Sequence, residues 1–117
     1  MEKIVDLTYL NSMADGSTEV IIEMIGLFKQ QIPEFTGEME THLKNEDWLA
    51  LSKIAHKAKS SITIMGMNDL ADELKRLELL AKEAKNIEDY PAVIEKFKTD
   101  CQRAVRELDE EVENLKA

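Results

Sequence analysis

Hydrophobic residues recur at three- and four-residue spacing along almost the whole chain, and this periodicity limits the possible folds more than any other feature. Such spacing places apolar side chains on one face of an α-helix, whereas a half-buried strand would need strict alternation. A chain patterned in this way buries its apolar residues by packing helix faces against one another. The most regular series, with nearly heptad spacing, consists of Tyr90, Ile94, Phe97, Cys101, Ala104, Leu108, Val112 and Leu115.

Three earlier series have the same spacing and predict three more long helices. The first of them passes through Pro33, which should kink the helix without ending it because the periodicity continues unchanged. Its members are Val20, Met24, Leu27, Phe28, Ile32, Phe35, Met39 and Leu43. The next series is Leu51, Ile54, Ala55, Ala58, Ile62 and Met65. The last is Leu70, Ala71, Leu74, Leu77, Ala81 and Ala84.

Short polar segments separate these series and predict the helix ends. Ser17, Asn45 and Asn68 are the expected N-caps, because their side chains can accept hydrogen bonds from first-turn amides. Gly66 should end the third helix, and Pro91 suits the first turn of the last one.

A further short helix, carrying Leu7, Leu10 and Met13, precedes the four long ones and should cover the bundle as a lid. We therefore predict an all-α fold, an up-down-up-down four-helix bundle with a short extra N-terminal helix. With 117 residues and no break in composition, residues 1–117 are expected to form a single domain.

The charge balance limits the possible partners. The formal net charge is -9, so nucleic acid and anionic membrane surfaces are poor partners. Cys101 is the only cysteine, which excludes an intrachain disulfide, and no apolar run approaches the ~20 residues of a membrane span. We expect a cytoplasmic protein, and nothing in the sequence requires more than a monomer.

His56 lies on the outer face of the predicted third helix. At about 100° per residue it stands roughly 150° from the centre of the apolar stripe. Ser52 and Ser60, one turn to either side, are small and should leave the imidazole open. Lys59 follows three residues later, at the edge of the same surface, where it can reach an anion held there.

The neighbourhood of His56 is basic although the protein is acidic. Between residues 43 and 60 the lysines outnumber the acidic residues, so a negatively charged partner could bind there. The candidate docking residues on this surface are Leu49, Ser52, Lys53, Lys57, Ser60 and Thr63.

Glu78 is the expected neighbour of His56 on the following helix. His56 precedes Met67 by eleven residues and Glu78 follows it by eleven, so the two stand at one height in an antiparallel pair, roughly 16 Å from the turn. A carboxylate that accepts a hydrogen bond from Nδ1 would fix the tautomer and leave Nε2 as the nucleophile.

The segment from Ala55 to Glu78 resembles the signature of histidine-containing phosphotransfer (Hpt) domains of two-component phosphorelays. The matching residues are His56, Lys59, Gly66, Leu70, Leu74, Leu77 and Glu78, with Ser60 where the family usually has glycine. The resemblance implies that His56 accepts a phosphoryl group from an aspartyl phosphate of a receiver domain and passes it to another receiver. It also implies that Lys59 supports the phosphoryl oxygens.

The alternative is a helical interaction module that docks a receiver without being phosphorylated, and Ser60 keeps this alternative open. The sequence lacks the residues that a metal site or an ATP site would require. The positions three and four from His56 hold lysine and serine, which excludes a metal site of the bundle type, and no glycine-rich loop is present for ATP. We expect a phosphocarrier and not an enzyme, with no bound cofactor and with Mg2+ supplied by the partner receiver.

Overall fold

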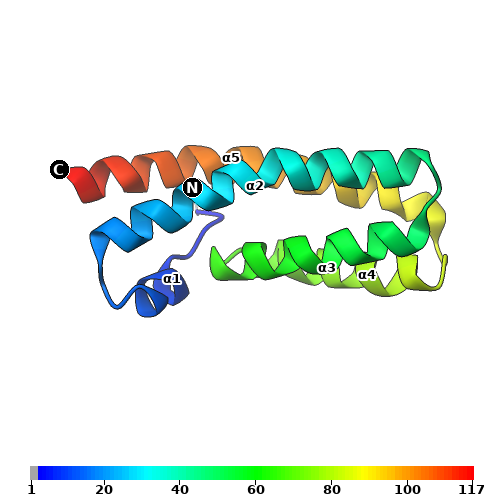
Figure 1. Ribbon diagram of the computed structural model, residues 1–117, viewed down its shortest axis with the longest axis horizontal. Helices are drawn as coiled ribbons and strands as arrows, with labels where there is room; N and C mark the ends of the chain where they lie inside the picture. Colours follow the sequence, from blue (N-terminus) through cyan, green and yellow to red (C-terminus); the bar gives the residue numbers. More distant parts are fainter. Residues whose placement is uncertain (1–2) are drawn as a thin grey trace.

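The computed structural model describes residues 3–117 and consists of helices joined by short turns. The helices are α1 (Thr8–Met13), α2 (Thr18–Lys44), α3 (Trp48–Ile64), α4 (Asn68–Lys82), the short 3-10 helix η1 (Ile87–Asp89) and α5 (Tyr90–Lys116). Figure 1 shows α2 lying along α5 and α3 along α4, with successive long helices running in opposite directions. The predicted all-α, up-down-up-down bundle is confirmed.

The long helices differ in length, and the difference creates the place for α1. Helices α2 and α5 each have 27 residues, whereas α3 has 17 and α4 has 15. One end of the α2–α5 pair therefore projects beyond α3 and α4, and α1 lies beneath this projection (Figure 1). Leu10 of α1 is fully buried there, which agrees with the predicted lid.

The core is built from the predicted apolar faces of α3, α4 and α5. Every member of the α3 series is buried, and the α5 series is buried from Tyr90 to Leu108. Phe35 of α2 meets Phe97 of α5 edge to face, with ring centroids 6.5 Å apart. Trp48 meets Tyr90 in the same way at 5.5 Å. Aromatic pairs thus join α5 to both α2 and α3.

The prediction of which face of α2 is buried is wrong for the first half of the helix. Ile21 and Ile25 are buried there, whereas Val20 is 39% and Leu27 is 54% exposed. The sequence carries two adjacent apolar stripes in this segment, and packing against its neighbours decides which one is buried. Helix α2 lies along α5, and in this half Ile21 and Ile25 are the buried residues while Leu27 remains exposed.

The predicted N-caps of α3 and α4 are also wrong, and so is one residue predicted for the apolar stripe of α4. Asp47, not Asn45, caps α3, with its carboxylate accepting from the Ala50 amide at 3.2 Å. Asn68 is the first residue of α4, after a Met67 cap that makes no side-chain bond. Ala84 is exposed and has φ 54°, because α4 has already ended. Several polar residues stand near each helix end, and local pattern alone does not choose among them.

The remaining predicted ends are confirmed. The Ser17 hydroxyl accepts from the Val20 amide, and Pro91 lies in the first turn of α5. Gly66 follows α3 with φ +73°, a left-handed conformation that favours glycine. Helix α2 continues through Pro33, whose side chain is exposed.

The N-terminal segment is held to the bundle by main-chain hydrogen bonds. The Asp6 amide donates to the Met65 carbonyl at 3.0 Å. The Glu107 carboxylate of α5 accepts from the amides of Ile4 at 2.8 Å and Val5 at 3.1 Å. Glu107 also pairs with Arg103 at 3.1 Å. These bonds place Val5 in the core and lead the chain into α1.

Because of the hydrogen bonds to Glu107, we expect the free energy of unfolding to depend on pH. Burial raises the pKa of Glu107, but the bonds from Ile4, Val5 and Arg103 outweigh burial and hold the pKa below its ordinary value of 4.5. A lowered pKa in the folded state stabilises the fold above pH 4.5, and this contribution is lost as the pH falls through the folded-state pKa. We expect Glu107→Gln to lower the free energy of unfolding by about 1–3 kcal/mol at pH 7, measured by urea denaturation.

The difference between wild type and Glu107→Gln should shrink when the same denaturation is repeated below pH 4.5. Glu113→Gln is the matched control, since Glu113 lies on the same helix and is exposed. Equal stabilities of wild type and Glu107→Gln at pH 7 would show that the carboxylate does not anchor the segment.

None of the helices in residues 3–117 combines the length and the apolarity that a bilayer span requires.

Candidate functional site

His56 projects into solvent from the middle of α3. The opposite face of the helix is anchored in the core by Ala55, Ala58 and Ile62, all fully buried. The His56 side chain is 63% exposed. A rigid helix therefore presents an accessible imidazole, which a reactive group on a partner protein can approach.

Glu78 of α4 contacts one ring nitrogen of His56. Both carboxylate oxygens lie 3.1 Å from Nδ1, at the height expected from counting residues on either side of the turn. The Glu78 side chain is 23% exposed, so the contact is partly shielded from water. An ionised carboxylate only accepts hydrogen bonds, so Nδ1 must carry a proton. In the neutral ring, the lone pair is then on Nε2.

The other predicted surface residues of α3, with one exception, lie on the outer face with His56. Leu49 is 56% exposed, and Lys53, Lys57, Ser60 and Thr63 are exposed.

Lys59 is half-buried at the edge of this face. Its main-chain carbonyl accepts from the Thr63 hydroxyl at 2.8 Å. Within residues 3–117, the amines of Lys53, Lys57 and Lys59 form no ion pair within 4.0 Å. Their charge is therefore available to an anion.

The exception is Ser52, and its predicted place on the docking surface is wrong. Ser52 is only 5% exposed, and its hydroxyl donates to the main-chain carbonyl of Glu78 at 2.8 Å. It lies about 40° around the helix from His56, on the flank that packs against α4. Close packing of α3 and α4 covers this flank, which the sequence of α3 alone does not reveal.

Lys75 and Lys82 of α4 extend the basic surface, and the sequence analysis missed them. They stand three residues before and four residues after Glu78, and both are exposed. Residues at these spacings share a helix face. The same spacing rule, applied to Glu78 and not only to His56, would have found them.

An apolar groove lies on the opposite flank of α3. It has a volume of about 140 Å³ and runs between α2 and α3, with Leu27 exposed at its rim. The Ser61 hydroxyl donates to Gln31 across it at 2.9 Å. The groove is lined by Met24, Leu27, Phe28, Gln31, Ser61, Ile64 and Met65. The groove thus adds apolar surface on the α2 side of the His56 face, and Lys75 and Lys82 add positive charge on the α4 side.

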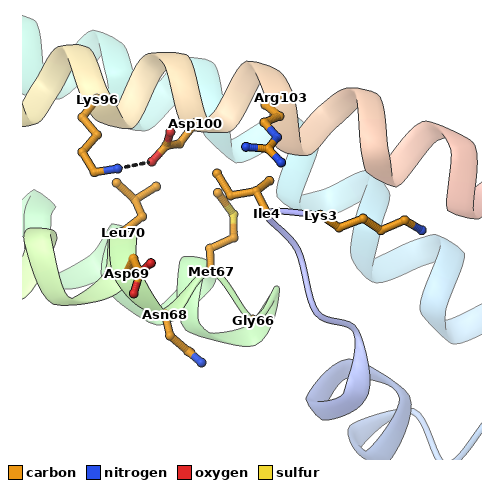
Figure 2. A pocket seen from close by; sticks show the side chains of 10 residues that line it. All are labelled: Lys3, Ile4, Gly66, Met67, Asn68, Asp69, Leu70, Lys96, Asp100 and Arg103. Atoms are coloured by element: carbon orange, nitrogen blue, oxygen red, sulfur yellow. Dashed lines mark hydrogen bonds and ion pairs between the residues drawn. The ribbon is translucent and has the colours of Figure 1, made fainter. Parts of the chain in front are cut away.

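A larger hollow of about 440 Å³ lies away from His56, at the start of α4 (Figure 2). Its cationic side chains already have acidic partners. Lys96 contacts Asp100 at 2.9 Å, and Arg103 contacts Glu107 at 3.1 Å. The hollow therefore offers little uncompensated charge to an anionic ligand.

Other reactive groups do not form a second site in the described part of the chain. No group of three or more histidine, cysteine, aspartate or glutamate residues there could hold a metal ion. Burial, with a smaller effect from the charge of Asp100, raises the pKa of the Cys101 thiol to about 12. A thiol with that pKa stays protonated and is a poor nucleophile at neutral pH. His56, by contrast, is 63% exposed on the outer face of α3.

Comparison with protein families decides the classification. The family model of the Hpt domain matches residues 23–117. This chain belongs to the Hpt domain family. The resemblance seen in the sequence between His56 and Glu78 is thereby confirmed. Comparisons with curated proteins and with solved structures give no match.

Hpt domains are phosphocarriers, not kinases, and they act in histidine phosphotransfer within two-component phosphorelays. The family generally interacts with receiver domains. The Hpt match begins within α2 and contains α3, α4 and α5, so it includes His56, Glu78 and all the surrounding lysines. Helix α1 lies before the matched range.

Proposed function

We propose that this Hpt domain is a phosphorelay intermediate that carries the phosphoryl group on Nε2 of His56. The group comes from an aspartyl phosphate of one receiver domain and is passed to an aspartate of another. The contact of Glu78 with Nδ1 carries the proposal, because it leaves the exposed Nε2 as the nucleophilic nitrogen. Membership of the Hpt family supports it.

The transfer step needs no proton from solvent. The Nε2 lone pair forms a bond to phosphorus while the bond from phosphorus to the aspartate oxygen breaks, and the electron pair leaves with the carboxylate. Nδ1 keeps its proton, so the phosphorylated ring is cationic, and the Glu78 carboxylate stabilises that charge. The return step to a second receiver reverses these changes.

The lysines complete the electrostatics of the site. The transferred group spreads negative charge over its oxygens in the transition state. Mg2+ held in the acidic pocket of the receiver would neutralise part of that charge. Lys59, one turn from His56, would supply a further cation from this protein, and its half-buried stem keeps the amine near the imidazole.

The receiver would dock over the outer face of α3. Its acidic pocket complements Lys53 and Lys57, and the α4 lysines Lys75 and Lys82 widen this basic surface. Leu49 and the α2–α3 groove offer apolar contact on either side of the basic centre. Because the surface charges are exposed, raising the salt concentration should slow association.

The proposal is tested with two purified receivers. One receiver is labelled with radioactive phosphate at its aspartate and mixed with this protein and Mg2+, and the second receiver is then added. Label should appear on this protein and then move to the second receiver. A receiver that binds but never transfers label would instead support the interaction module that docks without being phosphorylated.

Glu78→Gln is expected to slow phosphotransfer by about 10- to 100-fold. A carboxamide fills the same volume but carries no charge, and its NH2 group can face Nδ1 and favour the wrong tautomer. The rate at saturating receiver should fall while the dissociation constant of the receiver stays the same. Both are measured by rapid mixing over a range of receiver concentrations.

Glu73→Gln is the control for this experiment, because Glu73 is on another face of α4 and should leave the rate unchanged. Wild-type kinetics of Glu78→Gln would refute an orienting role for the carboxylate.

A further inference from the structure

Ser52 is an unusual residue in this bundle. Among residues 3–117, Ser52 is the one buried residue whose side chain is neither apolar nor aromatic. Buried hydroxyls are stable only when they are hydrogen-bonded, and Ser52 has one partner, the main-chain carbonyl of Glu78 at 2.8 Å. The partner belongs to the residue whose carboxylate contacts His56.

Two hydrogen bonds from α3 therefore converge on a single residue of α4. Ser52 and His56 stand four residues apart on one face of α3. The Ser52 hydroxyl bonds the backbone of Glu78, and His56 Nδ1 lies 3.1 Å from the Glu78 carboxylate oxygens. We propose that Ser52 is a positioning residue, which holds the backbone of Glu78 so that its carboxylate meets Nδ1. This inference rests on the proposed function of His56.

The Glu78 side chain needs such a constraint. It has three rotatable bonds and is partly exposed, so its carboxylate has several alternative positions in solvent. A hydrogen bond weakens steeply with small changes in length and angle, and helices packed only by apolar contacts can slide or rotate by that much. A bond to the Glu78 backbone fixes both the register and the rotation of α4 relative to α3 at the required height.

The loss of Ser52 should affect orientation more than folding. In an α-helix the Glu78 carbonyl also accepts the main-chain N–H four residues later, and a carbonyl has two lone pairs. Ser52→Ala would therefore leave no buried polar group unpaired. The variant should fold, with the contact between Glu78 and His56 loosened.

Ser61 provides a matched control on the same helix. Its hydroxyl also makes a hydrogen bond to a neighbouring helix, donating to Gln31 of α2 at 2.9 Å. This bond lies on the flank of α3 away from Glu78. Ser61→Ala removes an interhelical bond of the same kind without touching the residues that orient His56.

The test uses NMR of the His56 ring nitrogens in the unphosphorylated full chain, at a pH where the ring is neutral. The wild type and Ser61→Ala should show Nδ1 protonated and Nε2 unprotonated. In Ser52→Ala the population of the other tautomer should rise by about fivefold, because the free energy of one hydrogen bond no longer favours the orientation of Glu78. Thermal denaturation of the same samples shows that both variants are folded.

Phosphotransfer from a labelled receiver gives a second measurement. Ser52→Ala should lower the rate at saturating receiver by about fivefold, without changing the receiver concentration needed for half saturation. Ser52→Cys keeps the shape of the side chain with a somewhat larger atom and donates weakly, so it should behave like Ser52→Ala.

A wild-type tautomer population in both Ser52 variants would overturn the proposal. Because the ring nitrogens are observed without a receiver, this result is independent of whether His56 is phosphorylated. Failure of the wild type to accept label from any receiver would instead contradict the proposed function, and the NMR result would still decide the role of Ser52.

Discussion

Replacing His56 with glutamine is expected to abolish phosphoryl transfer to this protein, with a loss of at least about 1,000-fold. Glutamine has a similar length and polarity but no nucleophilic ring nitrogen. The side chain is 63% exposed, so the free energy of unfolding should stay within about 0.5 kcal/mol of the wild type. Label incorporation from a phosphorylated receiver and urea denaturation measure the two effects separately.

The second histidine of the chain is the control. His42 lies near the end of α2, and no carboxylate lies within 4.0 Å of its ring among residues 3–117. His42→Gln should accept label at the wild-type rate. Label that persists on His56→Gln would show that another residue accepts the phosphoryl group.

Gly66→Ala should cause a large loss of stability, about 3 kcal/mol. Gly66 has φ +73°, and a Cβ built there would lie 2.1 Å from the Asp6 carbonyl oxygen and 2.7 Å from the Asp6 Cβ. The alanine is strained in this conformation, and it must also push the N-terminal segment away. The hydrogen bond from Asp6 to Met65 would break with that movement.

Gly16 separates the two causes. It has the same φ of +73°, but nothing lies within 4 Å of a Cβ built on it. Gly16→Ala should therefore cost only the conformational strain, about 1 kcal/mol. Denaturation gives both values, and hydrogen exchange at the Asp6 amide should accelerate only in Gly66→Ala. Equal losses in the two variants would mean that contact with Asp6 does not matter.

The sequence predicted the helices and most of the core because the apolar periodicity of α3, α4 and α5 is unambiguous. It failed on the first half of α2, where Ile21 and Ile25 form a second apolar stripe beside Val20 and Met24. Only the packing of α2 against its neighbours in the fold selects between the stripes. Long-range packing of this kind is absent from a local pattern.

The site was predictable to a similar degree. Counting residues from the turn placed Glu78 at the height of His56, because antiparallel helices of regular rise have a fixed register. The same reasoning did not show that Ser52 is covered by α4, since the exposure of a residue on the flank of a helix depends on how closely its neighbour packs. Lys75 and Lys82 lie on α4, so the residue pattern of the helix that carries His56 does not reveal them.

Whether His56 carries the phosphoryl group is tested most directly by the chemical identity of the label acquired from a phosphorylated receiver in the presence of Mg2+. If His56 carries the phosphoryl group, the label is labile in acid and stable in alkali, and mass spectrometry assigns it to His56. Receivers that bind this Hpt domain but leave it unlabelled, or a label on any other residue, would show that His56 is not the phosphoryl carrier.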